Sequence, residues 1–120
     1  MSYVDAYVLP LPTQNIEAYR EMAENAGKIW MEHGALVYKE CIAEDMNSEW
    51  AKDTFPKSVN ALADETVIFA FIVFKSREHR DEVNAKVHKD PRLAGCGSME
   101  TMPFDMNRMT YGGFTTLVDL

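Results

Sequence analysis

The carboxylate of Glu40 could act as a general base. In a segment with the character of a strand, Glu40 alternates with Leu36, Tyr38 and Ile42, so all four side chains share one face. If that face points inward, the carboxylate lies in apolar surroundings, which is typical of a general base. The alternative is an edge strand on which Glu40 points to solvent or pairs with an arginine.

Two histidines are further candidates for acid–base catalysis. His33 follows Trp30 by three residues on an apolar helical stripe, where an imidazole could exchange a proton near neutral pH. The alternative is a histidine at a helix end that hydrogen-bonds a terminal carbonyl and favours the negative end of the helix dipole. His79 lies one helical turn before Val83 and so can face the core, or it can belong to an ordinary helix surface.

Arg80, beside His79, is a candidate for binding an anion or a carboxylate. Asp81 and Asn84 could complete a hydrogen-bonded set with it, and ordinary pairing on a helix surface is the alternative. Arg108 and Tyr111 are weaker candidates of the same kind on a predicted final strand. The predicted ligand-binding residues are therefore Trp30, Tyr38, Arg80, Asn84, Arg108 and Tyr111.

Motifs for metals, phosphates and activated nucleophiles are missing from the sequence. The histidines at positions 33, 79 and 88 lack HxH or HxxxH spacing, and neither a P-loop nor a GxSxG elbow occurs. Cys41 and Cys96 have no CxxC spacing and predict free thiols; Cys96, between two glycines, is either a reactive thiol or an inert one. We expect no metal and no cofactor, and the sequence leaves open whether the protein is an enzyme.

The elements that must position these side chains alternate in type along one predicted domain, residues 1–120. Thr13 is a predicted N-cap and Gly34 a helix stop. Strands are predicted over residues 3–9 (ending at two prolines), 35–43, 65–75 and 108–118, helices over 13–33 and 76–89, and a long connection over 44–64. Gly112-Gly113 predicts a bulge or a close backbone approach in the last strand. This β-α-β-β-α-β order predicts an α+β, ferredoxin-like fold, with a four-stranded antiparallel sheet and both helices on one face.

The third predicted strand is apolar on both faces, although two helices cover only one face of such a sheet. An uncovered apolar face is rare in soluble monomers, so we expect a second copy to cover it and form a homodimer. The alternative cover is the chain's own 44–64 segment, with Trp50 and Phe55 folded over the sheet. The predicted interface residues are Val67, Phe69, Phe71 and Val73.

The net charge of −7 disfavours nucleic acid and anionic membranes as partners. RNA-recognition motifs share the element order, and residues 69–74 fit the end of their third-strand signature. However, Val67-Ile68 replaces the basic–glycine pair. The longest apolar run, residues 67–74, is too short to span a bilayer, and no leader precedes it, so we expect a cytoplasmic protein with no membrane contact.

Landmarks along nearly the whole chain resemble the YbaA-like family of small bacterial proteins, domain of unknown function 1428. They are VDAYVLPLP, the segment from Trp30 to Cys41, Phe55-Pro56, Asp64 to Val67, Ser76 to Asn84, Asp90-Pro91-Arg92, Met102 to Asp105, Arg108-Met109 and Tyr111 to Phe114. The resemblance implies a dimeric α+β barrel and no established activity. Met106-Asn107 departs from the glycine-containing turn expected there. Similar folds include monooxygenases, dehydratases and binding proteins, so the fold alone does not decide function.

The sequence therefore predicts a cytoplasmic homodimer that binds a small organic molecule in a cleft between sheet and helices, with or without catalysis. The alternative from another class is a non-catalytic interaction or regulatory domain. More remote alternatives are a monooxygenase-like enzyme and an RNA-binding module.

Overall fold

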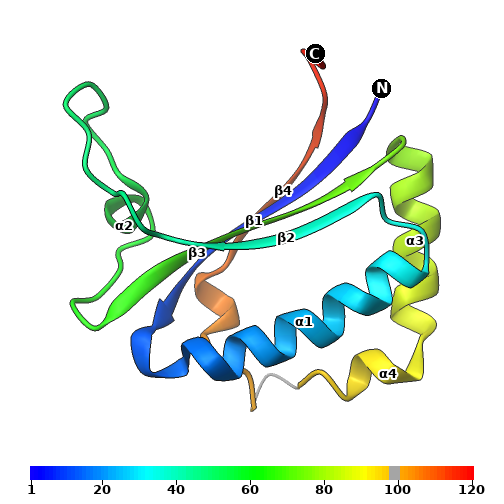
Figure 1. Cartoon of the computed structure of the whole chain (residues 1–120), viewed down its shortest axis with the longest axis horizontal. Coiled ribbons are helices and arrows are strands. Elements are labelled where there is room, and N and C mark those ends of the chain that lie inside the picture. Colours follow the sequence, from blue (N-terminus) through cyan, green and yellow to red (C-terminus); the bar gives the residue numbers. More distant parts are fainter. Residues whose placement is uncertain (98–100) are drawn as a thin grey trace.

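A four-stranded sheet covered on one face by helices forms the body of the protein (Figure 1). The computed structural model describes residues 1–97 and 101–120. The strands follow the order β2-β3-β1-β4, and every neighbouring pair is antiparallel. This arrangement confirms the predicted α+β, ferredoxin-like fold. The elements are β1 (Tyr3–Pro12), α1 (Ile16–Glu32), β2 (Val37–Ile42), α2 (Phe55–Ser58), β3 (Glu65–Phe74), α3 (Arg77–Lys89), α4 (Pro91–Ala94) and β4 (Thr110–Thr115), with 3-10 turns at Thr13–Asn15 and Met106–Arg108.

The predicted helix ends are mostly confirmed. The Ser76 hydroxyl accepts a 3.1 Å hydrogen bond from the backbone N–H of His79 at the start of α3, and Gly34 ends α1 with a φ of 115°. Thr13 is not the N-cap of α1: its hydroxyl donates to the carbonyl of Asp64, and a 3-10 turn precedes the helix.

The prediction that prolines stop the first strand is wrong, because Pro10 and Pro12 both lie within β1. β4 pairs with β1 only as far as Val8, so the end of β1 has an open edge. A proline there loses no ladder hydrogen bond, as its nitrogen can point to the open side.

β4 is shorter than predicted and begins after a turn that contains Arg108. Its pairing with β1 runs without interruption through Gly112 and Gly113, so the pair makes no bulge. A Cβ at Gly113 would lie within 3.0 Å of ring carbons of Tyr3. The group that lies close to Gly113 is therefore the aromatic side chain of Tyr3, and not the second backbone segment that was predicted.

The core lies between the sheet and the helices in two clusters of buried side chains. One joins β1, α1 and β3, and the other joins the C-terminal half of α1 to β3 and α3. Their buried members are Leu9, Leu11, Tyr19, Ala23, Ile68 and Ala70 in the first, and Ile29, Ala35, Ile72, Phe74, Val83 and Val87 in the second. Among the described residues, no helix is long and apolar enough to cross a membrane.

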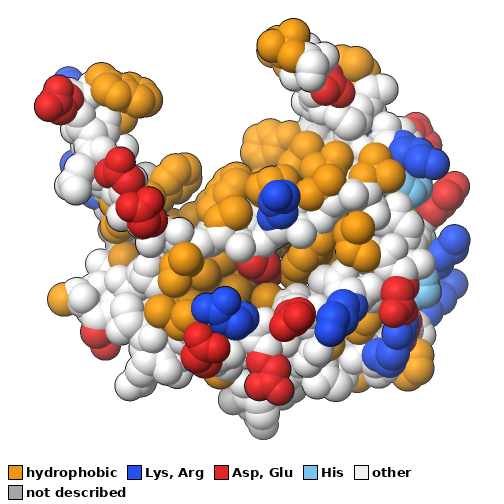
Figure 2. Space-filling model, in the orientation of Figure 1, with side chains coloured by type: hydrophobic (Ala, Val, Ile, Leu, Met, Phe, Trp, Pro, Cys, Tyr) orange, Lys and Arg blue, Asp and Glu red, His pale blue; other side chains and the backbone are white. Residues whose placement is uncertain are grey.

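The other face of the sheet is open and apolar. Figure 2 shows hydrophobic side chains lining a hollow between the projecting 44–64 segment and the C-terminal residues. Phe69 is 38 % exposed and Phe114 58 %. Trp50 is 90 % exposed and does not cover the sheet. Phe55 on α2 does lie against the start of β3, with its ring centroid 6.4 Å from that of Phe69, so the 44–64 segment covers only this end of the face.

Val67, one of the predicted interface residues, is already buried within the single chain. Val67 is only 3 % exposed within the single chain, so it has almost no surface to offer a partner. Phe69, Phe71 and Val73 share its face and keep exposed surface.

Candidate functional site

A carboxylate held by two tyrosines lies between α1 and β2. The Tyr19 hydroxyl, on α1, donates a 2.7 Å hydrogen bond to Oε1 of Glu40, and the Tyr38 hydroxyl, on β2, donates one of 2.7 Å to Oε2. The pairing of β2 with β3 places Tyr38 and Glu40 opposite buried Ile72 and Ala70, on the face that α1 covers. The structure thus brings together two residues that the strand alternation singled out, and it directs Glu40 toward the helices.

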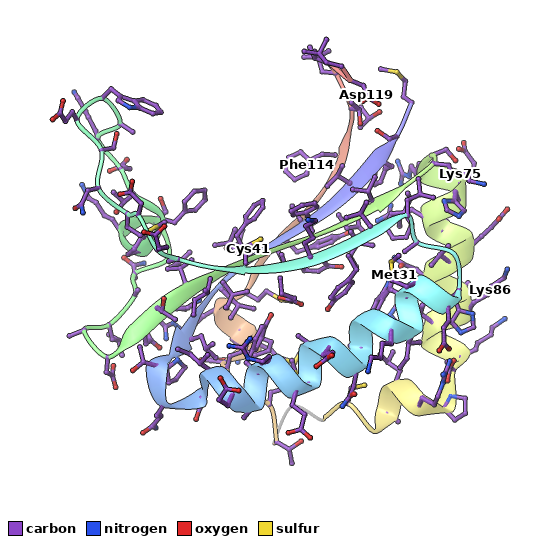
Figure 3. All side chains as sticks on the ribbon, in the orientation of Figure 1. Met31, Cys41, Lys75, Lys86, Phe114 and Asp119 are labelled. Carbon is purple, nitrogen blue, oxygen red and sulfur yellow. The ribbon has the colours of Figure 1, made fainter. Side chains whose placement is uncertain are left out.

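Glu40 and its two tyrosines line a cavity of about 410 Å³ at the sheet edge formed by β2. A second cavity of about 150 Å³ adjoins it under the centre of the sheet and shares the same three residues. The side chains of α1 and of the sheet meet in this region (Figure 3). The remaining walls are mostly apolar: Leu11, Ile16, Ala23, Ile42 and Ile68 in the larger cavity, and Leu9, Met22, Ala70, Ile72, Phe104 and Met109 in the smaller one. We refer to the two cavities together as the cleft.

The tyrosines of the cleft stay protonated far above neutral pH. Burial, followed by the charge and hydrogen bond of Glu40, raises the pKa of Tyr38 and of Tyr19 well above its ordinary value. Burial, followed by the nearby Asp5 charge, also raises the pKa of Tyr7. Tyr7 lines the smaller cavity, and its hydroxyl makes no hydrogen bond to any described residue. Three neutral phenols therefore surround the carboxylate of Glu40 in the cleft.

Trp30 and Asn84, both predicted ligand-binding residues, act on the cleft as a pair. The Trp30 indole N–H donates a 3.0 Å hydrogen bond to Oδ1 of Asn84 on α3, which fixes the indole. Trp30 lines the smaller cavity, with its ring centroid 6.3 Å from that of Tyr38. Asn84 does not line either cavity and positions Trp30 from behind.

His33 lies outside the cleft, at the C-terminal end of α1. Its Nε2 is 2.8 Å from Oδ2 of Asp90, at the junction of α3 and α4. Hydrogen bonds from Arg92, and then from His33, lower the pKa of Asp90 well below its ordinary value. The contact joins the ends of two helices. His33 therefore lies at a helix end, as the alternative interpretation expected, but its ring contacts a carboxylate and not a terminal carbonyl.

His79 is also separate from the cleft, in the turn between β3 and α3. Its Nδ1 accepts a 2.9 Å hydrogen bond from the backbone N–H of Lys75, and its ring packs edge-on against Phe74. Both ring contacts stabilise the turn. The three candidate catalytic residues, His33, Glu40 and His79, are thus dispersed, and Glu40 alone faces the cleft.

Arg80 and Tyr111 meet at a residue that sequence reasoning missed, Asp5. Oδ1 of this fully buried carboxylate accepts hydrogen bonds from Arg80 at 3.0 Å and from Tyr111 at 2.9 Å. Arg80 also donates to Asp81 and lies over the Tyr3 ring. The arginine is therefore occupied by the protein's own carboxylates. An aspartate that alternates with Tyr3 and Tyr7 in a core strand was the available signal.

Arg108 forms a second internal pair, with Glu65 at the start of β3. Its two terminal nitrogens donate to the two oxygens of that carboxylate at 2.7 and 2.9 Å, and one also donates to the carbonyl of Asn60. This bidentate pair fastens the end of the 44–64 connection to the turn before β4. Within residues 1–97 and 101–120, no three His, Cys, Asp or Glu side chains gather as a metal site would require.

Comparison with known proteins connects the chain to proteins without an assigned activity. The model of the family described as "Protein of unknown function (DUF1428)" matches residues 2–106. The proteins described as "Uncharacterized protein YbaA" from Escherichia coli (strain K12) and from Shigella flexneri are each 43% identical over 119 residues, which is 99% of this chain and 99% of theirs. Among solved structures, an uncharacterized NIPSNAP domain protein from Burkholderia xenovorans superimposes with a TM-score of 0.55 at 7% identity, covering 95% of this chain and 93% of that one. That likeness concerns the fold alone.

Proposed function

Because the chain belongs to the DUF1428 family of proteins of unknown function, we propose a function from its own side chains: it binds a small organic molecule in the cleft between α1 and the sheet. The observation that carries this proposal is the carboxylate of Glu40, held by Tyr19 and Tyr38 on the wall of a cavity of about 410 Å³. The ligand places its apolar body against the aliphatic and aromatic walls and its polar group at Glu40.

The size and lining of the cleft support this proposal. Sites for small molecules typically measure roughly 300–1,000 Å³ and combine apolar walls with a few converging polar groups. Here the Glu40 carboxylate and the Tyr7 hydroxyl are available inside the cleft, Arg20 and Glu24 lie at its mouth, and most of the remaining lining is apolar.

Glu40 is also held ready to contact a ligand. Each carboxylate oxygen accepts one tyrosine O–H, and a carboxylate oxygen has room for a further donor. Since the two tyrosines come from different elements, they fix both the position and the plane of the carboxylate before a ligand arrives, which lowers the entropic cost of binding. The same carboxylate can accept a proton, and proton abstraction from a bound ligand is the enzymatic form of this proposal.

A fragment screen by ligand-observed NMR tests whether the cleft binds small molecules. Ile42 lines the larger cavity and is 48 % exposed, so Ile42→Trp fills the cleft from its rim without overpacking the core. Leu36→Trp is the matched control, because Leu36 is 45 % exposed and lines neither cavity of the cleft. We expect fragments that bind wild type and Leu36→Trp equally and bind Ile42→Trp about tenfold more weakly. Equal binding to Ile42→Trp, or no fragment that binds wild type, would contradict the proposal.

We further propose that two copies pair through the open face of the sheet. Phe69 and Phe71 lie side by side there, with ring centroids 5.8 Å apart, and Phe114 extends from β4 onto the same face (Figure 3). Soluble monomers rarely expose such an apolar surface, and a two-fold axis makes one apolar face complementary to its own copy. A different protein partner on this face is the second candidate, and it would make the chain an interaction domain.

Light scattering after size-exclusion chromatography tests this pairing. We expect wild type to elute as a dimer and Phe71→Asp as a folded monomer, because the new carboxylate would be buried unpaired in the interface. Met31→Asp is the control, since Met31 is a 44 % exposed apolar residue on α1, on the opposite side of the sheet. A monomeric wild type at micromolar concentration, or a dimeric Phe71→Asp, would overturn the dimer.

A further inference from the structure

We propose that the ligand of the cleft is an organic cation, an amine with an aromatic or aliphatic body, whose ammonium group binds the carboxylate of Glu40. This inference rests on the proposed function and specifies the chemical class of the ligand.

Glu40 lacks a positive partner that every comparable carboxylate has. Four carboxylates among the described residues are at least partly buried: Asp5, Glu40, Glu65 and Asp90. Asp5 pairs with Arg80, Glu65 with Arg108, and Asp90 with Arg92 and His33. None of the ion pairs found in residues 1–97 and 101–120 includes Glu40. The other three carboxylates are therefore neutralised by cations of the same chain, and the carboxylate of Glu40 is free to pair with a cation from a ligand.

The cost of burying an unpaired carboxylate makes this difference meaningful. Withdrawing a carboxylate from water is unfavourable unless a cation or several donors replace the water. The two tyrosine hydroxyls supply one neutral donor to each oxygen of Glu40. An ammonium ion would supply both the missing positive charge and further donors, whereas a carboxylate or phosphate on the ligand would be repelled.

The charged residues at the mouth of the cleft do not neutralise Glu40. Arg20 lines the larger cavity, but its side chain is 67 % exposed and its Nε is 3.3 Å from Glu17. Glu24, a second carboxylate of the same cavity, is exposed to solvent, and its Oε1 lies 3.9 Å from Nζ of Lys28. The chain's net charge of −7 adds a weak general attraction for cations.

The aromatic walls suit the same class of ligand. The polar ends of three rings are already engaged: Tyr19 and Tyr38 with Glu40, and Trp30 with Asn84. What these rings offer the smaller cavity is therefore aromatic surface, which attracts cations within roughly 6 Å. The unpaired Tyr7 hydroxyl in that cavity can accept a second N–H from an ammonium group.

Matched probes test the inference by calorimetry. 2-Phenylethylamine, 2-phenylethanol and 3-phenylpropanoate carry one ring and a cationic, neutral or anionic head, and n-hexylamine with 1-hexanol repeats the comparison with an aliphatic body. We expect an amine to bind at least about tenfold more tightly than its neutral or anionic partner, with an affinity that falls as salt is added. Glu40→Gln should remove about tenfold of that advantage, while Glu21→Gln, on the exposed surface of α1 and outside both cavities, should change it by less than about twofold.

Because Glu40→Gln could disturb the tyrosine contacts, the salt dependence of the wild-type protein is an independent readout. Alcohols or the carboxylate binding as tightly as the amines, or amine affinity unchanged in Glu40→Gln and in high salt, would overturn the inference and leave the cleft as a ligand site of another class. Failure of both amines to bind would also overturn it. If fragments instead bind Ile42→Trp as tightly as they bind wild type, the proposed function itself is wrong.

Discussion

The hydroxyl of Tyr19, on α1, donates a 2.7 Å hydrogen bond to the carboxylate of Glu40, on the edge strand β2. Since β2 has a neighbouring strand on one side only, α1 makes its most extensive remaining contact with the body of the protein among the described residues. This one bond therefore contributes both to the geometry of the cleft and to the attachment of its outer wall.

Replacing Tyr19 by phenylalanine should loosen that wall. We expect Tyr19→Phe to lower the free energy of unfolding by about 1–3 kcal/mol, because a partly buried carboxylate loses one donor. Hydrogen exchange should show faster exchange in β2 than in β1. Tyr38→Phe is the control: it removes a similar bond to Glu40, but one made within β2, so α1 and β2 stay linked. Equal exchange of β2 in the two variants would contradict this role for Tyr19.

Gly27 on α1 makes room for the ring of Tyr38. A Cβ at position 27 would lie 2.6 Å from two ring carbons of Tyr38, whose hydroxyl is fixed by Glu40. We expect Gly27→Ala to destabilise the protein by about 1 kcal/mol or more in denaturant unfolding, since overpacking outweighs the gain in helix propensity. In a Tyr38→Ala background the same change should stabilise by up to about 1 kcal/mol. Stabilisation in both backgrounds would mean that the ring can move aside.

The pair of Asp5 and Arg80 holds β1 to α3. Asp5 is fully buried, and its Oδ2 has no hydrogen-bond partner, so removal of Arg80 would leave the carboxylate supported by Tyr111 alone. We expect Arg80→Met to cost about 3–5 kcal/mol of unfolding free energy, and Asp5→Asn in the same chain to recover a large part of that loss.

Arg20→Met is the matched control for Arg80→Met, because Arg20 pairs with Glu17 on the exposed surface of α1. Its effect should stay within about 0.5 kcal/mol. Similar costs for the two arginine variants would show that burial of Asp5 is not the cause.

The raised pKa values of Tyr19 and Tyr38 predict a loss of stability at high pH. Both pKa values lie above the ordinary 10.0 in the folded chain, so folding favours the protonated phenols. Their contribution is complete below about pH 10, the pKa of an unfolded tyrosine, and falls as pH rises above it. Between about pH 9 and 11, the free energy of unfolding measured with denaturant should fall more steeply for wild type than for the double variant Tyr19→Phe/Tyr38→Phe. Tyrosinate absorbance should report the same groups, and equal slopes would refute the assignment.

The element order and the faces of the strands were determined by the sequence. The doubly apolar third strand, the serine cap of α3 and the glycine stop of α1 are local patterns, and local patterns depend on residues a few positions apart. The same alternation placed Tyr38 and Glu40 on one face of β2. Proline positions misled the prediction, because the sequence does not tell where the neighbouring strand ends.

Tertiary structure alone decided which polar groups have partners. Asp5 meets Arg80 and Tyr111 across most of the chain, and His33 meets Asp90 at the junction of two helices. Such pairs depend on how helices cross the sheet, and no spacing in the sequence encodes that geometry. The sequence determined that Glu40 could face inward. Only the fold decided that two tyrosines hold its carboxylate at a cleft. Among the described residues, the arginines near the core pair with other carboxylates. The reason is that charged groups pair according to their distance in space and not along the chain.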